Sequence, residues 1–150
     1  MGFIYTKYLI LVIFIVSSSL LFVQCGAEDN LSKQVSLEKK ARRLWKEGKL
    51  ATTGPSSSMA VLIPEKKNWW GKVASPSGYV LKSYSADGNY HLLLKGSNNR
   101  KLHCIFSSKH PEVLELVKGD YIGPRDRLRG IVKGVGNGNP ILNGCYFANK

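Results

Sequence analysis

The sequence predicts an all-β protein, in which a small five-stranded barrel with one short helix follows an N-terminal signal segment and a basic helix. Three observations lead to this fold class. Apolar and polar residues alternate along short stretches between residues 79 and 147, with the period typical of β-strands. The dipeptides Asp87-Gly88 and Asn137-Gly138 separate such stretches and favour tight hairpin turns. The first 26 residues are instead dominated by one continuous apolar run.

The N-terminal segment has the layout of a secretory signal. Lys7 precedes an apolar run from Tyr8 to Val23, which ends at Gln24-Cys25. The run is shorter than the ~20 residues that span a bilayer comfortably. Three interpretations follow: a cleaved signal that releases a soluble protein, an uncleaved membrane anchor, and a lipoprotein signal.

The cysteine at the end of the run favours the lipoprotein interpretation. The segment LLFVQCG at 20–26 resembles a bacterial lipoprotein signal, in which this cysteine is acylated and becomes the new N-terminus. The resemblance implies a signal peptide over residues 1–24 and an acyl chain such as palmitate on Cys25. We therefore expect an exported lipoprotein, lipid-anchored in the cell membrane or outer membrane.

Charge is the strongest feature of the composition. The chain has 22 Lys and Arg against 10 Asp and Glu, a net charge of +12. Lys7 is the only charged residue before Cys25, so a processed chain keeps almost all of this excess. An excess of this size favours acidic partners by long-range attraction. For an anchored, exported protein we expect anionic lipid or an envelope polymer rather than nucleic acid.

Residues 25–58 are expected to hold the lipid anchor, a basic helix and a linker. The helix is predicted from Ser36 to Lys49, and its apolar residues form one stripe: Leu37, Ala41, Leu44 and Trp45. This helix lies either on an anionic membrane or, as its narrow stripe favours, against the following domain. Ala51 to Ser58 has the composition of a linker.

Residues 59–150 form the predicted barrel domain. Its candidate strands are Met59–Ile63, Tyr79–Ser85, Tyr90–Lys95, Lys101–Ser107, Leu128–Val135 and Pro140–Phe147. A short helix is expected from Pro111 to Gly119. From residue 79 onward, three strands, one helix and two strands follow one another. This is the order of an OB-fold, a five-stranded, partly open Greek-key barrel.

The same region resembles a known family. The runs that carry the resemblance are HCIF at 103–106, VLELVKGDYI at 113–122, LRGIVKG at 128–134 and ILNGCYF at 141–147. They are similar to the small bacterial OB domains described as tRNA anticodon-binding-like. The resemblance implies an OB-fold and, by analogy of fold alone, a nucleic-acid ligand.

The chain has three cysteines, an odd number, so in an exported protein at least one of them has no disulfide partner within the chain. If Cys25 is acylated, Cys104 and Cys145 remain, and both fall among apolar neighbours on their predicted strands. Export favours a disulfide between them, because oxidising compartments preserve such bonds. Two buried free cysteines are the alternative.

A ligand-binding face on such a barrel would combine cations with exposed aromatic rings. The candidate residues are Trp69, Trp70, Tyr79, Lys82, Tyr84, Tyr90, Arg125, Arg127 and Arg129. Such a face would bind single-stranded nucleic acid or an acidic oligosaccharide. Alternatively, the rings fill or rim the barrel and the arginines form a solvated surface.

The sequence contains no recognised catalytic or metal-binding motif. None of His91, His103 and His110 stands at nucleophile or zinc-ligand spacing. We therefore expect a membrane-anchored envelope lipoprotein with a non-catalytic binding or interaction domain and no cofactor. An OB protein that binds nucleic acid or acidic oligosaccharide and an enzyme with an unrecognised site are the alternatives.

Overall fold

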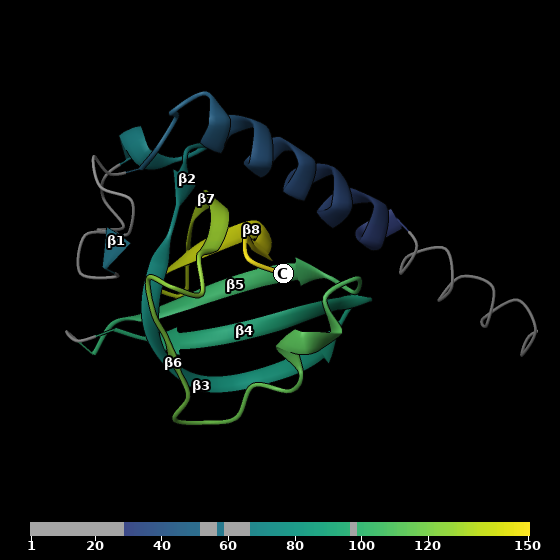
Figure 1. Ribbon diagram of the computed structural model, residues 1–150, viewed down its shortest axis with the longest axis vertical. Coiled ribbons are helices and arrows are strands. Elements are labelled where there is room, and N and C mark those ends of the chain that lie inside the picture. The colour runs from purple at the N-terminus through teal and green to yellow at the C-terminus, as the bar shows by residue number, and fades with distance from the viewer. Residues whose placement is uncertain (1–28, 52–56, 59–66, 97–98) are drawn as a thin grey trace, which may run out of the picture.

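The computed structural model describes residues 29–51, 57–58, 67–96 and 99–150 (Figure 1). These residues are mostly β, as predicted, and one helix covers residues 29–46. The remaining elements are β1 (Ser57–Ser58), η1 (Lys67–Trp69), β2 (Val73–Ala74), β3 (Pro76–Ala86), β4 (Asn89–Lys95), β5 (Lys101–Ser107), η2 (Pro111–Val113), β6 (Tyr121–Ile122), β7 (Leu128–Gly136) and β8 (Asn139–Phe147).

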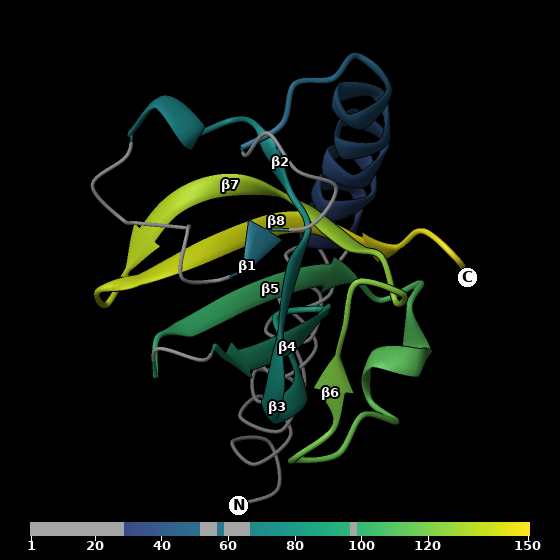
Figure 2. The same cartoon turned by 60° about the vertical axis from the view of Figure 1, so that its left-hand side comes forward.

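All strands belong to one curled sheet. Its order is β1-β3-β4-β5-β8-β7-β2, and β6 pairs with β3 beside this path. Neighbours are antiparallel except β1 with β3 and β5 with β8, which are parallel. Only Ser75 separates β2 from β3, yet β2 pairs with β7 and β3 pairs with β4. The sheet therefore curls strongly, as Figure 2 shows.

The prediction of five strands is wrong in number, because the sheet formed by the described residues has eight. The five long strands lie where the sequence pattern placed them, and each of the three additional strands, β1, β2 and β6, is only two residues long. These short strands form because distant partners are available: Val73 pairs with Ile131, and Tyr121 pairs with Tyr79. Two residues are too few to show an alternating pattern.

Both predicted hairpin turns are confirmed. Asp87 and Gly88 have φ of 51° and 72°, and Asn137 and Gly138 have φ of 51° and 75°. Two successive positive φ values define a type I′ turn, whose twist matches that of the flanking strands. These turns fix the register of β3 with β4 and of β7 with β8.

The predicted helix at Pro111 is only one 3-10 turn, Pro111–Val113. The following segment forms hydrogen bonds to β3 instead of continuing the helix. Gly119 N–H donates to Val80 O over 2.9 Å, and Val80 N–H donates to Asp120 O over 2.8 Å. Residues 119 and 120 are therefore bonded to β3, whereas the residues before them form isolated turns, such as Leu114 N–H to Pro111 O.

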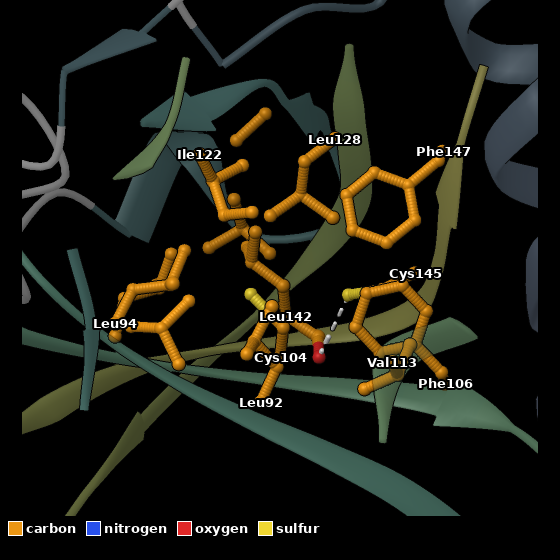
Figure 3. Packing of buried hydrophobic residues seen from close by; sticks show 14 of the residues in the cluster. Leu92, Leu94, Cys104, Phe106, Val113, Ile122, Leu128, Leu142, Cys145 and Phe147 are labelled. Atoms are coloured by element: carbon orange, nitrogen blue, oxygen red, sulfur yellow. Dashed lines mark hydrogen bonds between the residues drawn. The ribbon is translucent and has the colours of Figure 1, made fainter. Parts of the chain in front are cut away.

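The core fills the inside of the curled sheet (Figure 3). Its side chains alternate along β4 and β5, and β8 adds Leu142 and Cys145; the fully buried residues of β4 and β5 are Leu92, Leu94, Leu102, Cys104 and Phe106. Because successive side chains of a strand point to opposite faces, the intervening residues of β4 and β5 point outward. That outward face is the candidate functional site described below.

The predicted disulfide is absent: Cys104 and Cys145 are both buried as free thiols. The register of β5 and β8 explains this difference. An irregularity in the pairing places Cys104 opposite Leu142 and Cys145 opposite Phe106, so the two cysteines do not face each other directly. Cys145 Sγ instead donates a hydrogen bond to Leu142 O over 3.4 Å.

Helix 29–46 packs on the outside of the sheet, which confirms the predicted contact with the domain. Its apolar stripe joins a second buried cluster, formed by Ala41, Leu44, Val73, Ile131 and Tyr146. A Cβ atom at Gly144 would overlap the backbone of Leu37 and Glu38, so β8 and the helix touch backbone to backbone there. Gly144 N–H also donates to Gln34 Oε1 over 2.9 Å in the buried contact.

The helix ends earlier than the predicted Lys49, because Gly48 adopts φ of 69°. Gly48 N–H donates to Trp45 O and Lys49 N–H donates to Leu44 O, which is the Schellman pattern of a helix end. The predicted linker begins as part of the fold: Leu50 pairs with Val73, and Ala51 N–H donates to Val73 O.

No helix within the described ranges is long and apolar enough to cross a bilayer. The signal peptide 1–24, its apolar run and Cys25 lie outside those ranges, as does the strand candidate Met59–Ile63. The three interpretations of the N-terminal segment therefore stay predictions.

Candidate functional site

The outward face of β3, β4 and β5 brings polar and aromatic side chains together. Tyr84 pairs with His91 across the first hairpin, and Leu93 pairs with both Lys82 and His103. Directly opposed residues of neighbouring strands share a face. Lys82, Tyr84, His91 and His103 therefore form one group, which we name the Tyr–His cluster.

The three rings of the Tyr–His cluster stack on one another. The ring centroids of Tyr84 and His91 lie 5.0 Å apart with 11° between planes, and those of Tyr84 and His103 lie 6.4 Å apart with 24°. The Lys82 ammonium lies 4.9 Å from the Tyr84 ring centroid, within the range of a cation–π contact. A cation, a phenol and two imidazoles thus occupy one patch of the sheet.

Hydrogen bonds define the tautomers of the two imidazoles. His91 Nε2 lies 3.2 Å from Ala86 O and therefore carries a proton, because a carbonyl oxygen only accepts. In a neutral pair, His91 Nδ1 then accepts from His103 Nε2 over 2.9 Å. Burial and the charge of His91 lower the pKa of His103. Two charged imidazoles would place two N–H donors against each other, in keeping with the lowered pKa of His103.

The other predicted binding residues lie elsewhere. Trp69 is partly buried against the core, as is Tyr90, and the Trp70 ring lies over Gly134 of β7. Tyr79 is 54% exposed and contacts the ring of Tyr121. Of the predicted set, the structure brings only Lys82 and Tyr84 into one group.

The three arginines are also separate from the Tyr–His cluster. The Arg129 guanidinium lies 3.6 Å from the Trp45 ring centroid and so holds helix 29–46 to β7. Arg125 and Arg127 are exposed in the loop before β7. Their backbone oxygens accept hydrogen bonds from Asn149 Nδ2 and Ala148 N–H, which fixes this loop to the C-terminal residues.

Sequence reasoning missed His91 and His103 as members of a site. One signal was present: a two-residue turn at Asp87-Gly88 places residue 84 opposite residue 91. The position of His103 additionally requires the register of β4 with β5, which the segment Gly96–Arg100 does not reveal by its composition.

A second polar group links the helix to η2. His110 Nε2 lies 2.9 Å from Glu38 Oε2, and His110 Nδ1 lies 3.1 Å from Glu112 Oε1. Arg42 pairs with Glu38 over 2.8 Å. Burial alone would raise the pKa of Glu38, but the hydrogen bonds and charges of His110 and Arg42 bring it below its ordinary value. Each imidazole nitrogen of His110 thus lies within hydrogen-bond distance of a carboxylate.

No protein-family model matches the sequence, and the comparison with curated proteins finds no match. The resemblances to a lipoprotein signal and to the tRNA anticodon-binding-like domains therefore stay predictions. Within the described parts of the chain, no three His, Cys, Asp or Glu side chains are grouped so that they could hold a metal ion.

Proposed function

We propose that this protein is an exported, lipid-anchored lipoprotein of the cell envelope whose sheet is an OB-like, non-catalytic binding domain. The strand order is the observation that carries the OB-like assignment. Counted as one strand interrupted at Ser75, β2 and β3 give the cyclic order β2/β3–β4–β5–β8–β7, in which β2 returns to β7. Five strands connected in this way, with β5 parallel to β8, fit a small Greek-key barrel.

The Tyr–His cluster is the proposed binding site. In OB domains the second and third strands carry the ligand face. In this assignment those strands are β4 and β5, which contribute His91 and His103. Tyr84 and Lys82 extend the same face from β3, so the site has hydrogen-bonding edges and a cation.

An acidic oligosaccharide suits this face better than a nucleic acid. Nucleic-acid platforms leave ring faces open for the bases, each stacked base contributing ~1–3 kcal/mol. In the Tyr–His cluster the rings of Tyr84, His91 and His103 stack on each other instead. The Tyr84 phenol and the Lys82 ammonium remain suited to hydroxyl and carboxylate groups, whereas both ring nitrogens of the buried His91 already have partners within the protein.

Calorimetric titration with acidic oligosaccharides and with single-stranded DNA tests the site. We expect the oligosaccharide to bind and to shift the imidazole NMR signals of His91 and His103. Tyr84→Ala should weaken this binding about tenfold, since one hydrogen bond to a charged group contributes ~1.5–3 kcal/mol. Trp70→Ala is the matched control, because Trp70 is 44% exposed and its ring lies over Gly134 of β7, outside the cluster. Equal losses in both variants, or binding of DNA alone, would contradict the proposal.

Intact mass of the protein extracted from membranes tests the anchoring. The proposal predicts a chain that begins at Cys25 and carries added acyl mass. A mass equal to that of unprocessed Met1–Lys150 would reject the lipoprotein assignment.

A further inference from the structure

The face of helix 29–46 that points away from the sheet carries a row of exposed cations. We name it the cationic ridge, and its residues are Lys33, Lys39, Lys40, Arg43 and Lys46. At 3.6 residues per turn they fall within an arc of about 140°. Leu37, Ala41 and Leu44, which pack toward the sheet, lie outside this arc, about 20° to 80° beyond its edge at Lys33.

Acidic residues offset this ridge only in part, and Asp29, exposed one turn before Lys33, lies within the same arc. Glu38 belongs to the sheet side of the helix, where it binds Arg42 and His110. Glu47, beyond the helix end, pairs with Lys49 over 2.9 Å and more distantly with Arg43 over 3.6 Å. Like charges at neighbouring helical positions destabilise a helix slightly. The ridge therefore gains from contact with an anionic surface.

The centre of the ridge fits a phosphate group. Ser36, Lys39, Lys40 and Arg43 line a shallow depression in the surface. A hydroxyl donor among three cations can bind phosphodiester oxygens through charge-assisted hydrogen bonds. We propose that the cationic ridge docks on anionic phospholipid head groups and holds the protein against the bilayer along this helix.

Chain length favours a lipid surface over a free polymer. This step rests on the proposed function, which places the acylated Cys25 in the membrane. Only four peptide units join Cys25 to Asp29, a reach of at most about 14 Å. The ridge from Lys33 to Lys46 is about 20 Å long at 1.5 Å per residue. Attraction between the ridge and an anionic surface extends over ~8 Å at physiological salt. An anchor at Cys25 holds the ridge at a distance from the membrane that is similar to this length.

The contact must be electrostatic rather than an insertion. The apolar stripe of the helix is already buried against Val73, Ile131 and Tyr146, so it is not available to the acyl layer. Each Lys or Arg near an anionic surface raises the association constant about fivefold. Binding through the ridge should therefore weaken with salt and with each cation removed.

Lysine acetylation read out by mass spectrometry tests the docking on the whole protein. The protein is added to vesicles of phosphatidylcholine alone or mixed with phosphatidylglycerol, at low and at high salt. We expect Lys33, Lys39, Lys40 and Lys46 to be protected severalfold in the mixed vesicles at low salt only. Protection in neutral vesicles, or none in the mixed vesicles, overturns the proposal.

Paired variants separate the ridge from general positive charge. Lys39→Gln with Lys40→Gln should lower partition into mixed vesicles about twenty-fivefold, fivefold for each cation. The control, Lys109→Gln with Lys118→Gln, removes the same charge at exposed positions outside the helix. An equal loss in the control rejects the ridge as the docking surface. Protection of the ridge by a soluble acidic polysaccharide, but not by mixed vesicles, would assign it to an envelope polymer and also reject the proposal.

Flotation of the same vesicles at high salt distinguishes the two proposals. A lipid-anchored chain floats at high salt in both kinds of vesicle, whatever the ridge does. Flotation without ridge protection contradicts the docking alone. Ridge protection at low salt without flotation at high salt supports the docking and contradicts the anchor.

Discussion

Replacing Gly144 by alanine is expected to destabilise the protein far more than the same change at Gly138. Both glycines have positive φ, 58° and 75°, and both lie in or beside β8. They differ in what an added Cβ would meet. At Gly138 nothing lies within 4 Å, whereas at Gly144 the Cβ would overlap the backbone of Leu37 and Glu38. The comparison thus isolates the contact between β8 and helix 29–46.

The magnitude follows from two contributions, the cost of the backbone conformation and the cost of displacing the helix. Left-handed backbone conformation costs a non-glycine residue about 1–2 kcal/mol, and this cost applies at both positions. At Gly144 the helix must also move, because backbone atoms cannot rotate away as a side chain can. That movement strains the buried bond from Gly144 N–H to Gln34 Oε1, and an unsatisfied buried group costs about 1–3 kcal/mol. We expect Gly144→Ala to exceed Gly138→Ala by about 2–3 kcal/mol.

Urea unfolding followed by tryptophan fluorescence measures both variants. Trp45 lies in the helix contact, so its emission should also report displacement of the helix in Gly144→Ala before unfolding. Equal free energies of unfolding for the two variants would refute the backbone contact between Gly144 and the helix. A lower stability of Gly144→Ala with unchanged hydrogen exchange in residues 34–45 would refute the helix as its cause.

Three further predictions concern the helix contact and the core. Leu44→Ala should lower the free energy of unfolding by about 2–4 kcal/mol, because it leaves a cavity beside Val73 and Ile131; a urea titration measures it, and a loss below about 1 kcal/mol would contradict the packing. Because folding lowers the pKa of Glu38, its ionised form stabilises the protein at pH values above the ordinary pKa of 4.5, and this stability is lost as the pH falls through the lower pKa of the folded state. Glu38→Gln should therefore make the thermal midpoint depend less on acid pH. Burial raises the pKa of the Cys145 thiol and the neighbouring Cys104 raises it further, so thiol reagents should label this residue only on unfolding. A two-dalton mass gain of the native protein on reduction would instead indicate a disulfide.

Local sequence rules predicted the elements whose causes are local. The turn dipeptides at residues 87–88 and 137–138 require only positive φ at adjacent residues. The long strands require only an alternation of apolar and polar residues, and β5 has the predicted bounds Lys101–Ser107. The helical stripe around Leu44 correctly favoured contact with the domain. Each of these features depends on residues within a few positions of one another.

Features that depend on distant pairing could not be predicted. The relation of Cys104 to Cys145 depends on an irregularity between β5 and β8, which no pattern within either strand encodes. Arg129 contacts Trp45 across most of the chain and so was assigned to a ligand face. His103 joins Tyr84 only through the registers of two successive strand pairs.

The residues that follow helix 29–46 are bonded directly to the sheet. Its Schellman bond comes from Lys49 N–H, and Val73 N–H donates to the carbonyl of the same Lys49. The next residue, Leu50, pairs with Val73. Figure 1 places β3 and β4 on the far side of the sheet from the helix. The helix and the sheet therefore keep a fixed relative orientation. A partner that binds the helix leaves the Tyr–His cluster pointing away from itself.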